Sequence, residues 1–508
     1  MRASIRQFVS RTRLASTIRP WFAPSIQPSL AALPALRFIP VCALLLASCL
    51  VTPAYAQVGQ PKDADLINRG RYLATAADCA ACHQAKGADA SPFGGGTPIA
   101  SPMGPIYASN ITPDKTHGIG NWTFEQFEAA MRNGRSPTKG YLYPAMPYTA
   151  YSHMSDGDLR ALYTYLMEGV APSANQPPQT SLPFPFIRPA MVGWNLLFLH
   201  AGPDASATAE PGSVDRGRYV ADALGHCSSC HTPRNTLFGE DLSKLLSGGQ
   251  VGSWYAPNIT PDKTGIGSWS DQELVQFLTH GSNAHAVAGG DMGLAVERSL
   301  SKLTPEDVQS LVKYLRSVPP VATPYDSSEP KSNANAAPSL NVASVEPQHG
   351  KDLATLENGS GVNGAHLFEA TCASCHGANG SGSADGQHPD LATNNAVLMR
   401  SPDNLIMTIA QGVHRNVNGQ AVAMPGFAGA LTNDQIGAIA TYVRGTVGGM
   451  HTPAVTASDV TQVRASVVPP SWLIRNAGWL VIVGLLVLLI VLVAIVLFIK
   501  RSITGRRS

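Results

Sequence analysis

The sequence predicts a mainly α-helical protein with three tandem domains and one C-terminal transmembrane helix. Three observations support this fold class. The pentapeptide Cys-x-x-Cys-His occurs three times, amphipathic helical patterns flank each copy, and an apolar stretch runs from Trp479 to Ile499. The chain has 508 residues, which is too long for one hydrophobic core and long enough for several domains.

The three pentapeptides lie at residues 79–83, 227–231 and 372–376. Two thiols at this spacing can add to the two vinyl groups of one porphyrin, and the adjacent imidazole can then bind the iron. A structural zinc site needs a second ligand pair, which none of the three motifs has, and a redox dithiol does not explain three copies. We therefore predict three covalently bound haem c groups. Their attachment sites are Cys79, Cys82, Cys227, Cys230, Cys372 and Cys375, and their proximal iron ligands are His83, His231 and His376.

Residues 1–56 have the features of a secretory signal peptide. An arginine-rich leader without acidic residues precedes an apolar run at 38–51, and Ala-Tyr-Ala at 54–56 fits the small-x-small cleavage rule. The mature chain would then begin at Gln57. Alternatively, Leu-Ala-Ser-Cys at 46–49 resembles a bacterial lipobox, in which Cys49 would be lipidated.

Residues 479–499 form the predicted transmembrane helix. At about 1.5 Å per residue this stretch is about 30 Å long, which matches the hydrocarbon core of a bilayer; a buried core helix is the alternative. The basic tail at 500–508 is expected in the cytoplasm by the positive-inside rule. Covalent haem c is assembled on the opposite face. We therefore expect the haem domains in the periplasm, on a single C-terminal anchor in the bacterial inner membrane.

An internal repeat relates the first two motif regions. Gly-Arg-Tyr-Leu at 70–73 precedes the first pentapeptide, and Gly-Arg-Tyr-Val at 217–220 precedes the second. The heptapeptide Asn-Ile-Thr-Pro-Asp-Lys-Thr then follows at 110–116 and again at 258–264. Its turn-forming composition predicts a loop around a haem edge.

Each motif region ends in an amphipathic helix that begins with a Ser or Thr in the N-cap position. Helices on either side of a haem, joined by long loops, are what a small cytochrome c fold requires. The helices are expected at 155–168, 304–316 and 432–444. The predicted divisions are cytochrome c domains at 57–170, 213–318 and 349–450, a connector at 171–212, a linker at 319–348 and a juxtamembrane segment at 451–478.

The two connecting segments differ in composition. The linker is rich in Pro, Ser, Asn and Ala, which indicates a flexible or semi-extended chain. The connector contains apolar runs at 182–187 and 194–198. It is expected to pack against the first two domains or, alternatively, to form a contact surface for a partner subunit or the membrane.

The sixth iron ligand is expected to be a methionine, which raises the reduction potential relative to a second histidine. Met292 is the only methionine of the middle region, and Met146 lies at nearly the same distance from its own pentapeptide. Met424, in an Ala-Met-Pro-Gly sequence, is the candidate in the third region; each of the three could instead be a core residue. The weaker candidates are Met103, Met131, Met154, Met399 and Met407, and the alternative histidines are His117, His153, His280, His285 and His414.

Composition and motif content argue against several other functions. Charged residues make up 14% of the chain and the net charge is +2, so no surface for nucleic acid is indicated. A nucleotide-binding loop, a nucleophile elbow and an acid–base constellation are all absent from the sequence, so we assign no catalytic residues.

With these motifs the chain resembles the tri-haem cytochrome c subunits of membrane-bound periplasmic dehydrogenases. The similarity rests on the three pentapeptides, the Asn-Ile-Thr-Pro-Asp repeats and the Leu-Pro-Phe-Pro-Phe segment at 182–186. The group includes quinoprotein alcohol dehydrogenase, flavin-dependent gluconate, sorbitol and fructose dehydrogenases, and molybdenum-dependent aldehyde dehydrogenases. The resemblance implies a non-catalytic subunit that passes electrons from a catalytic dehydrogenase subunit of flavin, quinoprotein or molybdenum type to ubiquinone in the membrane.

Three other functions remain open at the level of sequence. The chain could be a cytochrome subunit of a terminal oxidase, a free membrane-anchored electron shuttle, or a multi-haem peroxidase with one open iron. A plausible methionine ligand in every region argues against the peroxidase. The distinct C-terminal span departs from family members thought to be held by amphipathic segments, which leaves the partner class open.

Overall fold

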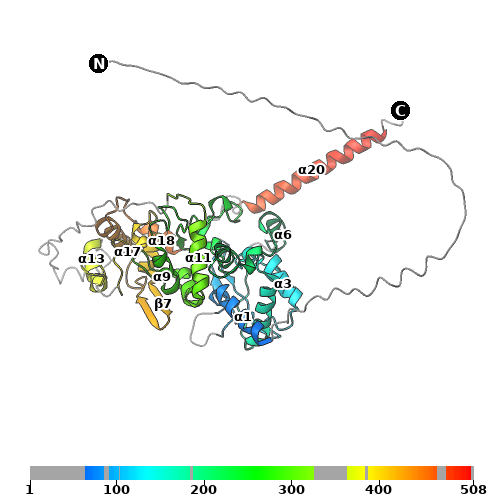
Figure 1. The fold of residues 1–508 in the computed structure, drawn as a ribbon. Helices are drawn as coiled ribbons and strands as arrows, with labels where there is room; N and C mark the ends of the chain where they lie inside the picture. Colours follow the sequence, from blue (N-terminus) through cyan, green and yellow to red (C-terminus); the bar gives the residue numbers. More distant parts are fainter. Residues whose placement is uncertain are drawn as a thin grey trace, which may run out of the picture. The chain divides into compact units, whose positions relative to one another are not determined.

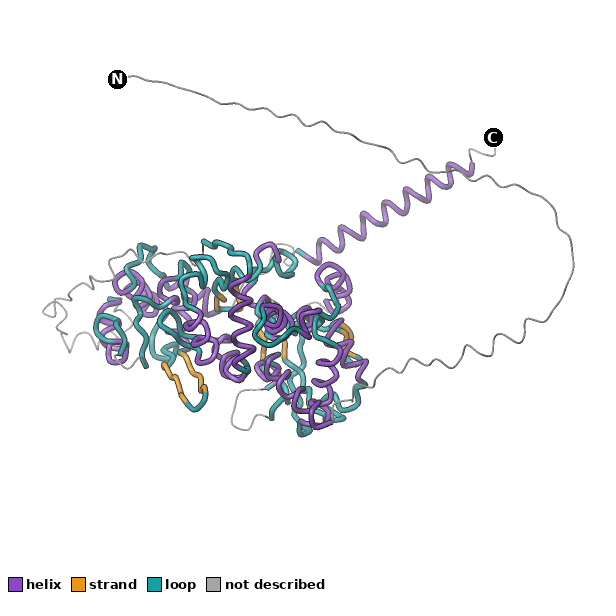
Figure 2. Tube along the Cα trace, in the orientation of Figure 1, coloured by secondary structure: helices purple, strands orange, loops and turns teal. Residues whose placement is uncertain are grey.

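The computed structural model describes residues 63–84, 91–101, 103–182, 187–324, 363–383, 387–465 and 476–504. The predicted signal peptide at 1–56 lies outside these residues, as does the predicted linker at 319–348 beyond residue 324. Figure 1 traces the chain along its length, and Figure 2 marks its helices and strands. We refer to residues 63–170, 213–318 and 363–465 as the first, middle and third motif units.

The described chain is mainly helical, as the sequence predicts. The first motif unit contains α1 (Asp63–Ala76), α2 (Cys79–His83), β1 (Pro98–Ile99), β2 (Ile106–Tyr107), α3 (Phe124–Asn133), β3 (Arg135–Ser136), β4 (Gly140–Tyr141), α4 (Tyr148–Tyr151), α5 (Asp156–Thr164) and η1 (Tyr165–Gly169). The helices α6 (Ile187–Phe198) and η2 (Ala205–Thr208) follow.

The middle and third motif units repeat the plan of a first helix, a pentapeptide turn and a terminal helix. The middle unit contains α7 (Val214–Arg218), η3 (Tyr219–Leu224), α8 (Ser228–His231), η4 (Leu242–Lys244), β5 (Gly249–Val251), β6 (Trp254–Ala256), α9 (Asp271–His280), α10 (Gly290–Arg298), η5 (Leu300–Lys302) and α11 (Pro305–Ser317). The third unit contains α13 (Gly364–Thr371), α14 (Ala373–His376), α15 (Asn395–Leu398), α16 (Asp403–Gln411), β7 (Val413–Val417), β8 (Gln420–Met424), α17 (Asn433–Tyr442), η7 (Val443–Val447) and α18 (Ala457–Arg464).

The strands of the described chain form only short antiparallel hairpins. They pair as β1 with β2, β3 with β4, β5 with β6 and β7 with β8. The longest is β7–β8, in which Val413 pairs with Met424 and Val417 with Gln420. Figure 2 shows these hairpins in orange among the purple helices. Most of the core side chains come from the helices, and the short hairpins lie in the segments between them.

The amphipathic helices begin where the sequence predicts, because side chains satisfy their first free N–H groups. Thr304 caps the terminal helix of the middle unit and Thr432 that of the third. Thr432 also forms a capping box with Gln435, as Ser270 does with Glu273 at the start of α9. Such caps fix the helix starts from local sequence alone.

A glycine lets the first helix of each unit cross its terminal helix closely. The three glycines are Gly70, Gly217 and Gly364. A Cβ atom at any of them would collide with a backbone carbonyl of the terminal helix, respectively that of Ala161, Ser310 or Ala438. The three units therefore share one helix crossing, although the first-helix sequence of the third unit differs.

The buried apolar side chains form two hydrophobic cores in the described residues. One core runs through both the first and the middle motif unit, from Leu73 to Val318, and includes Val417 of the third unit. The other core lies within the third unit, between Leu367 and Val460. The first two units are thus packed as one body, a relationship that the sequence left open.

At the C-terminal end, α20 (Ala477–Thr504) is a single helix. Several of its large apolar side chains are exposed, including Trp479 and Ile490. Within the described part of the chain, no helix was found to be long and apolar enough to cross a membrane. The predicted transmembrane helix at 479–499 is therefore not confirmed.

Candidate haem-binding sites

Each pentapeptide forms a single helical turn. The turns are α2, α8 and α14, and each follows the first helix of its unit. In the middle and third turns the backbone N–H of the histidine donates to the carbonyl of the first cysteine, for example His231 to Cys227 at 2.9 Å. This turn brings two thiols and one imidazole to a common face. All six motif cysteines are free thiols.

Burial keeps the thiols of the first and middle pentapeptides neutral. It raises the pKa of Cys79 and of Cys82 to about 12, and the negative charge of Asp78 adds to the effect on both. It also raises the pKa of Cys227 to about 12 and that of Cys230 to about 11. Zinc requires thiolates, and no group of three or more potential metal-ligating side chains occurs among the described residues. Each site thus presents two free thiols, the groups that thioether attachment requires.

Each motif histidine is oriented by a backbone carbonyl. The Nδ1 atom of His83 lies 2.7 Å from the oxygen of Ser109, and that of His231 lies 2.7 Å from the oxygen of Pro257. A carbonyl can only accept, so Nδ1 carries the proton and the lone pair is on Nε2, where a haem iron would bind. Burial lowers the pKa of both imidazoles, which favours this neutral form.

The third histidine follows the same rule with a different partner. The Nδ1 atom of His376 lies 3.3 Å from the oxygen of Pro389, and burial is the main reason that its pKa is lowered. The third unit lacks the repeated heptapeptide, and Pro389 reaches the histidine from a shorter loop. Thus all three imidazoles are prepared in the same protonation state.

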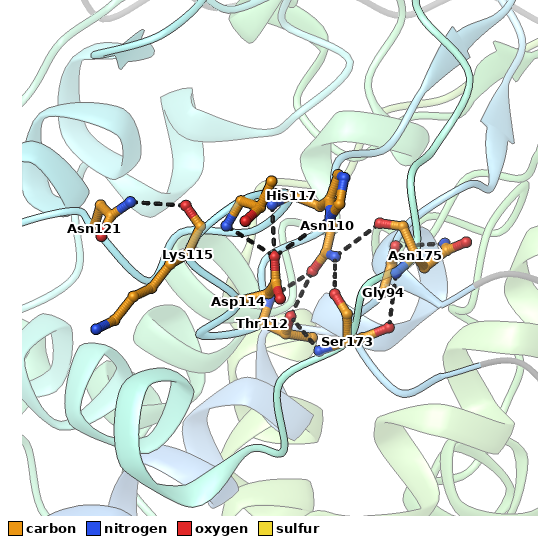
Figure 3. Close-up of polar contacts among 10 residues, drawn as sticks. Gly94, Asn110, Thr112, Asp114, Lys115, His117, Asn121, Ser173 and Asn175 are labelled. Carbon is orange, nitrogen blue, oxygen red and sulfur yellow. Dashed lines mark hydrogen bonds and ion pairs between the residues drawn. The ribbon is translucent and has the colours of Figure 1, made fainter.

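Figure 3 shows the hydrogen bonds of the first heptapeptide loop, which directly follows Ser109 in the sequence. Asn110, the next residue, is buried and its Oδ1 accepts from the backbone N–H of Thr112 at 2.9 Å and from its hydroxyl at 2.7 Å. Its Nδ2 donates to the carbonyls of Ser173 at 2.7 Å and Asn175 at 2.9 Å. The asparagine therefore ties the loop to the chain that follows the terminal helix.

The second heptapeptide repeats these bonds. Oδ1 of Asn258 accepts from the backbone N–H of Thr260 at 2.9 Å and from its hydroxyl at 2.8 Å, and Nδ2 donates to the carbonyl of Val321 at 2.7 Å. The predicted loop is present at both sites. The sequence analysis did not identify the carbonyls of Ser109 and Pro257 as partners of the motif histidines. Each of the two residues directly precedes a heptapeptide, and this position was the available signal.

The three predicted methionine ligands occupy different local structures. Met146 lies in the loop between β4 and α4, Met292 lies on α10, and Met424 is the last residue of β8. All three are half-buried, and the first two pack against the shared core. Their assignment as iron ligands stays a prediction.

The rival methionines are more deeply packed, apart from Met103, which is half-buried. Met131, Met154, Met399 and Met407 are buried. Met154 is fully enclosed in the core, and Sδ of Met399 lies 3.5 Å from Nδ2 of Asn404. Such side chains fill space between helices and are less able to face a porphyrin.

Among the alternative histidines, His285 is engaged elsewhere. Its Nε2 lies 3.0 Å from Oε1 of Glu273, and its ring stacks on Trp269. Nδ1 of His153 lies 3.0 Å from the carbonyl oxygen of Gly202, and Nδ1 of His280 lies 2.8 Å from the hydroxyl of Thr279. His117 lies beside Asp114, and His414 is exposed on β7. Only in His285 does the contact engage Nε2, so it argues against His285 as an iron ligand.

The first and middle sites lie next to each other. The Cys230 thiol contributes to raising the pKa of Cys82, so the two attachment turns are close enough to interact electrostatically. Arg298, at the end of the helix that carries Met292, donates from Nη1 to the carbonyl of Ala80 inside the first attachment turn at 2.6 Å. One helix of the middle unit therefore contacts both sites.

Free paired thiols beside an imidazole with an available Nε2 fit a covalent haem c, so the site geometry defines c-type cytochrome units. The family model described as cytochrome c matches residues 67–169 and 361–446. It does not match the middle pentapeptide, whose geometry nevertheless repeats that of the first.

Similarity to known proteins extends over most of the chain. It is 42% identical over 443 residues to the fructose dehydrogenase cytochrome subunit of Gluconobacter japonicus, covering 84% of this chain and 90% of the relative. It is 36% identical over 442 residues to the cytochrome c subunit of a quinone alcohol dehydrogenase from Komagataeibacter europaeus, covering 83% and 90%. It is 36% identical over 439 residues to the gluconate 2-dehydrogenase cytochrome c subunit of Pantoea cypripedii, covering 83% and 94%.

The chain belongs to the family of cytochrome c subunits of dehydrogenase complexes. Members of this family transfer electrons and are not the catalytic subunits. The predicted resemblance is therefore confirmed, and with it the expectation that the chain is not an enzyme on its own.

Proposed function

We propose that this protein carries three haem c groups and transfers electrons from a partner dehydrogenase subunit to ubiquinone or another acceptor of the respiratory chain. The observation that carries the proposal is the threefold recurrence of a pentapeptide turn whose histidine Nδ1 lies against a backbone carbonyl. The haem supplies one-electron chemistry when bound. The chain holds it by two cysteines and one histidine in each unit, with Met146, Met292 and Met424 as sixth ligands.

Contacts between the units support a continuous route for electrons. Cys230 lies close enough to Cys82 to help raise its pKa, and Arg298 joins the middle unit to the first attachment turn. The middle and third units are joined at Asn404, whose Oδ1 accepts from the N–H of Tyr255 at 2.9 Å and whose Nδ2 donates to its carbonyl at 2.8 Å. Each haem unit therefore contacts its neighbour along the chain.

The partner is proposed to be a flavin-containing sugar or polyol dehydrogenase subunit. This choice rests on the fructose dehydrogenase relative, whose identity of 42% exceeds the 36% of the quinone alcohol dehydrogenase relative. Quinoprotein and molybdenum partners remain the alternatives. The terminal-oxidase alternative has weaker support, because a cbb3-type oxidase subunit from Sinorhizobium medicae matches over only 83 residues, or 16% of this chain.

We place the haem units in the periplasm, anchored to the bacterial inner membrane by residues 479–499. The exposed apolar side chains of α20 support an anchor, because water would solvate them poorly and lipid would cover them. Lys500 and Arg501 then lie on the cytoplasmic side. Truncation before Ala477 is expected to release a haem-containing protein from washed membranes; retention of the truncated chain would refute this anchor.

The experiment that tests the proposal is purification of the tagged full-length protein in mild detergent. Mass spectrometry would identify bound subunits, and a reduced pyridine haemochrome spectrum would count haem c per chain. A flavin-containing dehydrogenase subunit with three haems per chain supports the proposal. Co-purifying oxidase subunits, or fewer than three haems, would overturn it, and a carbon monoxide difference spectrum with an open iron would favour the peroxidase.

A further inference from the structure

The third motif unit contacts the loop that leads to Met292 in the middle unit. This loop, residues 281–289, lies between α9 and α10 and is called the middle ligand loop below. Its contacts with the third unit come from the strand β7 and from residues 393–395, where α15 begins. The hairpin β7–β8 also carries Met424, so one hairpin faces the candidate ligand regions of two haem sites.

Arg415 on β7 joins the two ends of the middle ligand loop. Its Nε donates to the carbonyl of His280 at 3.2 Å, and its Nη1 donates to the carbonyl of Ala288 at 2.9 Å. The two ends of the loop are also bonded to each other, because the N–H of Ala288 donates to the carbonyl of Gly281 at 2.7 Å. The rigid guanidinium fork is suited to hold two acceptors at once.

Arg415 is held at this position without a carboxylate. Its side chain is buried, and among the described residues no ion pair joins it to an acid. Nη2 has no hydrogen-bond partner. A buried cation of this kind depends on its carbonyl partners, so the loop and the arginine constrain each other.

Further bonds connect the same two parts. The N–H of Asn395 donates to the carbonyl of His285 at 2.7 Å, and the hydroxyl of Thr393 donates to that of Ala284 at 3.3 Å. The N–H of Asn416 donates to Oε2 of Glu297 on α10, at 2.9 Å. The third unit thus contacts the loop before Met292 and the helix that contains it.

The first unit has a corresponding arrangement, supplied by α6. There the candidate ligand loop also begins at the last residue of a helix, Asn133, whose carbonyl accepts from Nδ2 of Asn195 at 3.1 Å. Nη1 of Arg188 donates to the carbonyl of Tyr141 at 2.8 Å, on the far side of that loop. In both units a segment from outside holds the loop that leads to the methionine.

We propose that Arg415 is a positioning residue for Met292, so that the third motif unit completes the iron ligation of the middle haem. The proposal rests on the proposed function, in which Met292 is the sixth ligand. It gives the third unit a second role besides carrying its own haem. The middle haem has the reduction potential of a methionine-ligated haem only when the third unit is in place.

The test compares Arg415→Gln with wild type in the full-length, haem-loaded protein. Two readouts are used, the absorption band of methionine–iron ligation and the reduction potentials from a spectroelectrochemical titration. The variant is expected to lose the methionine band of one haem out of three and to show one lowered potential, with haem content unchanged. Arg415→Lys should restore part of the band, because one ammonium retains the charge but not the fork.

Three further variants serve as controls. Arg400→Gln removes an exposed arginine of the same unit and is expected to leave both readouts unchanged. Asn404→Ala breaks a different contact between the two units and should have the smaller effect. Thr393→Ala loses one loop contact and replaces Arg415→Gln if that variant does not accumulate.

Met292→Leu assigns the affected haem. If Met292→Leu and Arg415→Gln remove the same band and the double variant removes no more, Arg415 acts through Met292. An unchanged band and unchanged potentials in Arg415→Gln, or losses that add in the double variant, would overturn the inference. A Met292→Leu variant with a full methionine band would instead refute the ligand assignment in the proposed function, whatever Arg415→Gln shows.

Discussion

The hydroxyl of Tyr72 in the first motif unit donates to Oδ2 of Asp307 in the middle unit at 2.5 Å. The reverse contact is also present, since Tyr219 of the middle unit donates to Oδ2 of Asp158 in the first at 2.6 Å. The two tyrosines are the equivalent residues of the Gly-Arg-Tyr repeats. The first two units are therefore joined by a reciprocal pair of bonds, as in a twofold-symmetric dimer.

Each of the two aspartates also accepts hydrogen bonds from an arginine of its own unit. Arg216 donates to Asp307 from Nε and Nη2, both at 2.7 Å, and Nε of Arg69 donates to Asp158 at 2.7 Å. Both carboxylates are buried, so they require these donors. The duplicated sequence thus encodes an interface as well as a fold.

Removal of one tyrosine hydroxyl is expected to weaken this interface. Burial raises the pKa of Tyr72 to about 12, so its hydroxyl is a donor at neutral pH. Tyr72→Phe leaves Asp307 with one donor fewer and should lower the free energy of unfolding by about 1–2 kcal/mol. Chemical denaturation of the haem-loaded protein measures this. Tyr107→Phe, on the short strand β2, is the matched control, and equal stabilities of the two variants would contradict the assigned role.

The third unit lacks these tyrosine–aspartate hydrogen bonds and has a hydrophobic core of its own. At the position that Tyr72 and Tyr219 occupy after their glycines it has His366, which is exposed. On its terminal helix, Gln435 occupies the position of Asp158 and Asp307 in the first two units. The duplication therefore explains why the first two units supply most of one core, to which the third unit contributes Val417.

The glycine of the helix crossing provides a second prediction. Gly364→Ala places a Cβ against the carbonyl of Ala438, so the helices must separate, and a loss of about 1–3 kcal/mol is expected. Gly157→Ala is the control, because that helical position faces open space and alanine favours helix. Thermal unfolding should show a lowered midpoint for Gly364→Ala alone. A lowered midpoint for both would point to a general glycine effect.

The heptapeptide asparagines are expected to act on the haem through the histidines. Asn258→Ala removes the bonds to Thr260 and Val321, which frees the carbonyl of Pro257 and with it Nδ1 of His231. We expect a changed potential for one haem, since hydrogen bonds behind a ligand tune the metal. Redox titration tests this. Asn121→Ala, which loses only an exposed bond to the Lys115 carbonyl, should leave all three potentials unchanged.

Local sequence accounts for much of this architecture. The pentapeptide turns, the helix caps at Thr304 and Thr432 and the turn-forming heptapeptides are encoded within a few residues, and they could be predicted. The contacts of Tyr72 with Asp307 and of Arg415 with Ala288 join residues far apart in the chain, and their partners carry no local signal. The orienting groups at Ser109 and Pro257 are backbone carbonyls, which any residue can supply.

The last prediction concerns a buried carboxyl near the middle attachment turn. Burial raises the pKa of Asp222 to about 6, and the hydroxyl of Tyr314 donates to its Oδ2 at 2.7 Å. The folded state therefore holds the proton more tightly than the unfolded chain, whose aspartate has a pKa of about 3.9. Stability from this group is full below about pH 4 and is lost as pH rises through about 6, by about 2–3 kcal/mol in total.

Asp222→Asn is neutral at every pH and keeps an acceptor for Tyr314. Its stability relative to wild type should therefore improve steadily from pH 4 to pH 7, where the wild-type carboxyl has ionised in a buried position. Urea denaturation of both proteins across this range measures the difference. Asp65→Asn, at an exposed position of α1, is the control for the loss of one carboxylate from the chain. A pH-independent difference between wild type and Asp222→Asn would mean that the carboxyl is already ionised in the fold at pH 4.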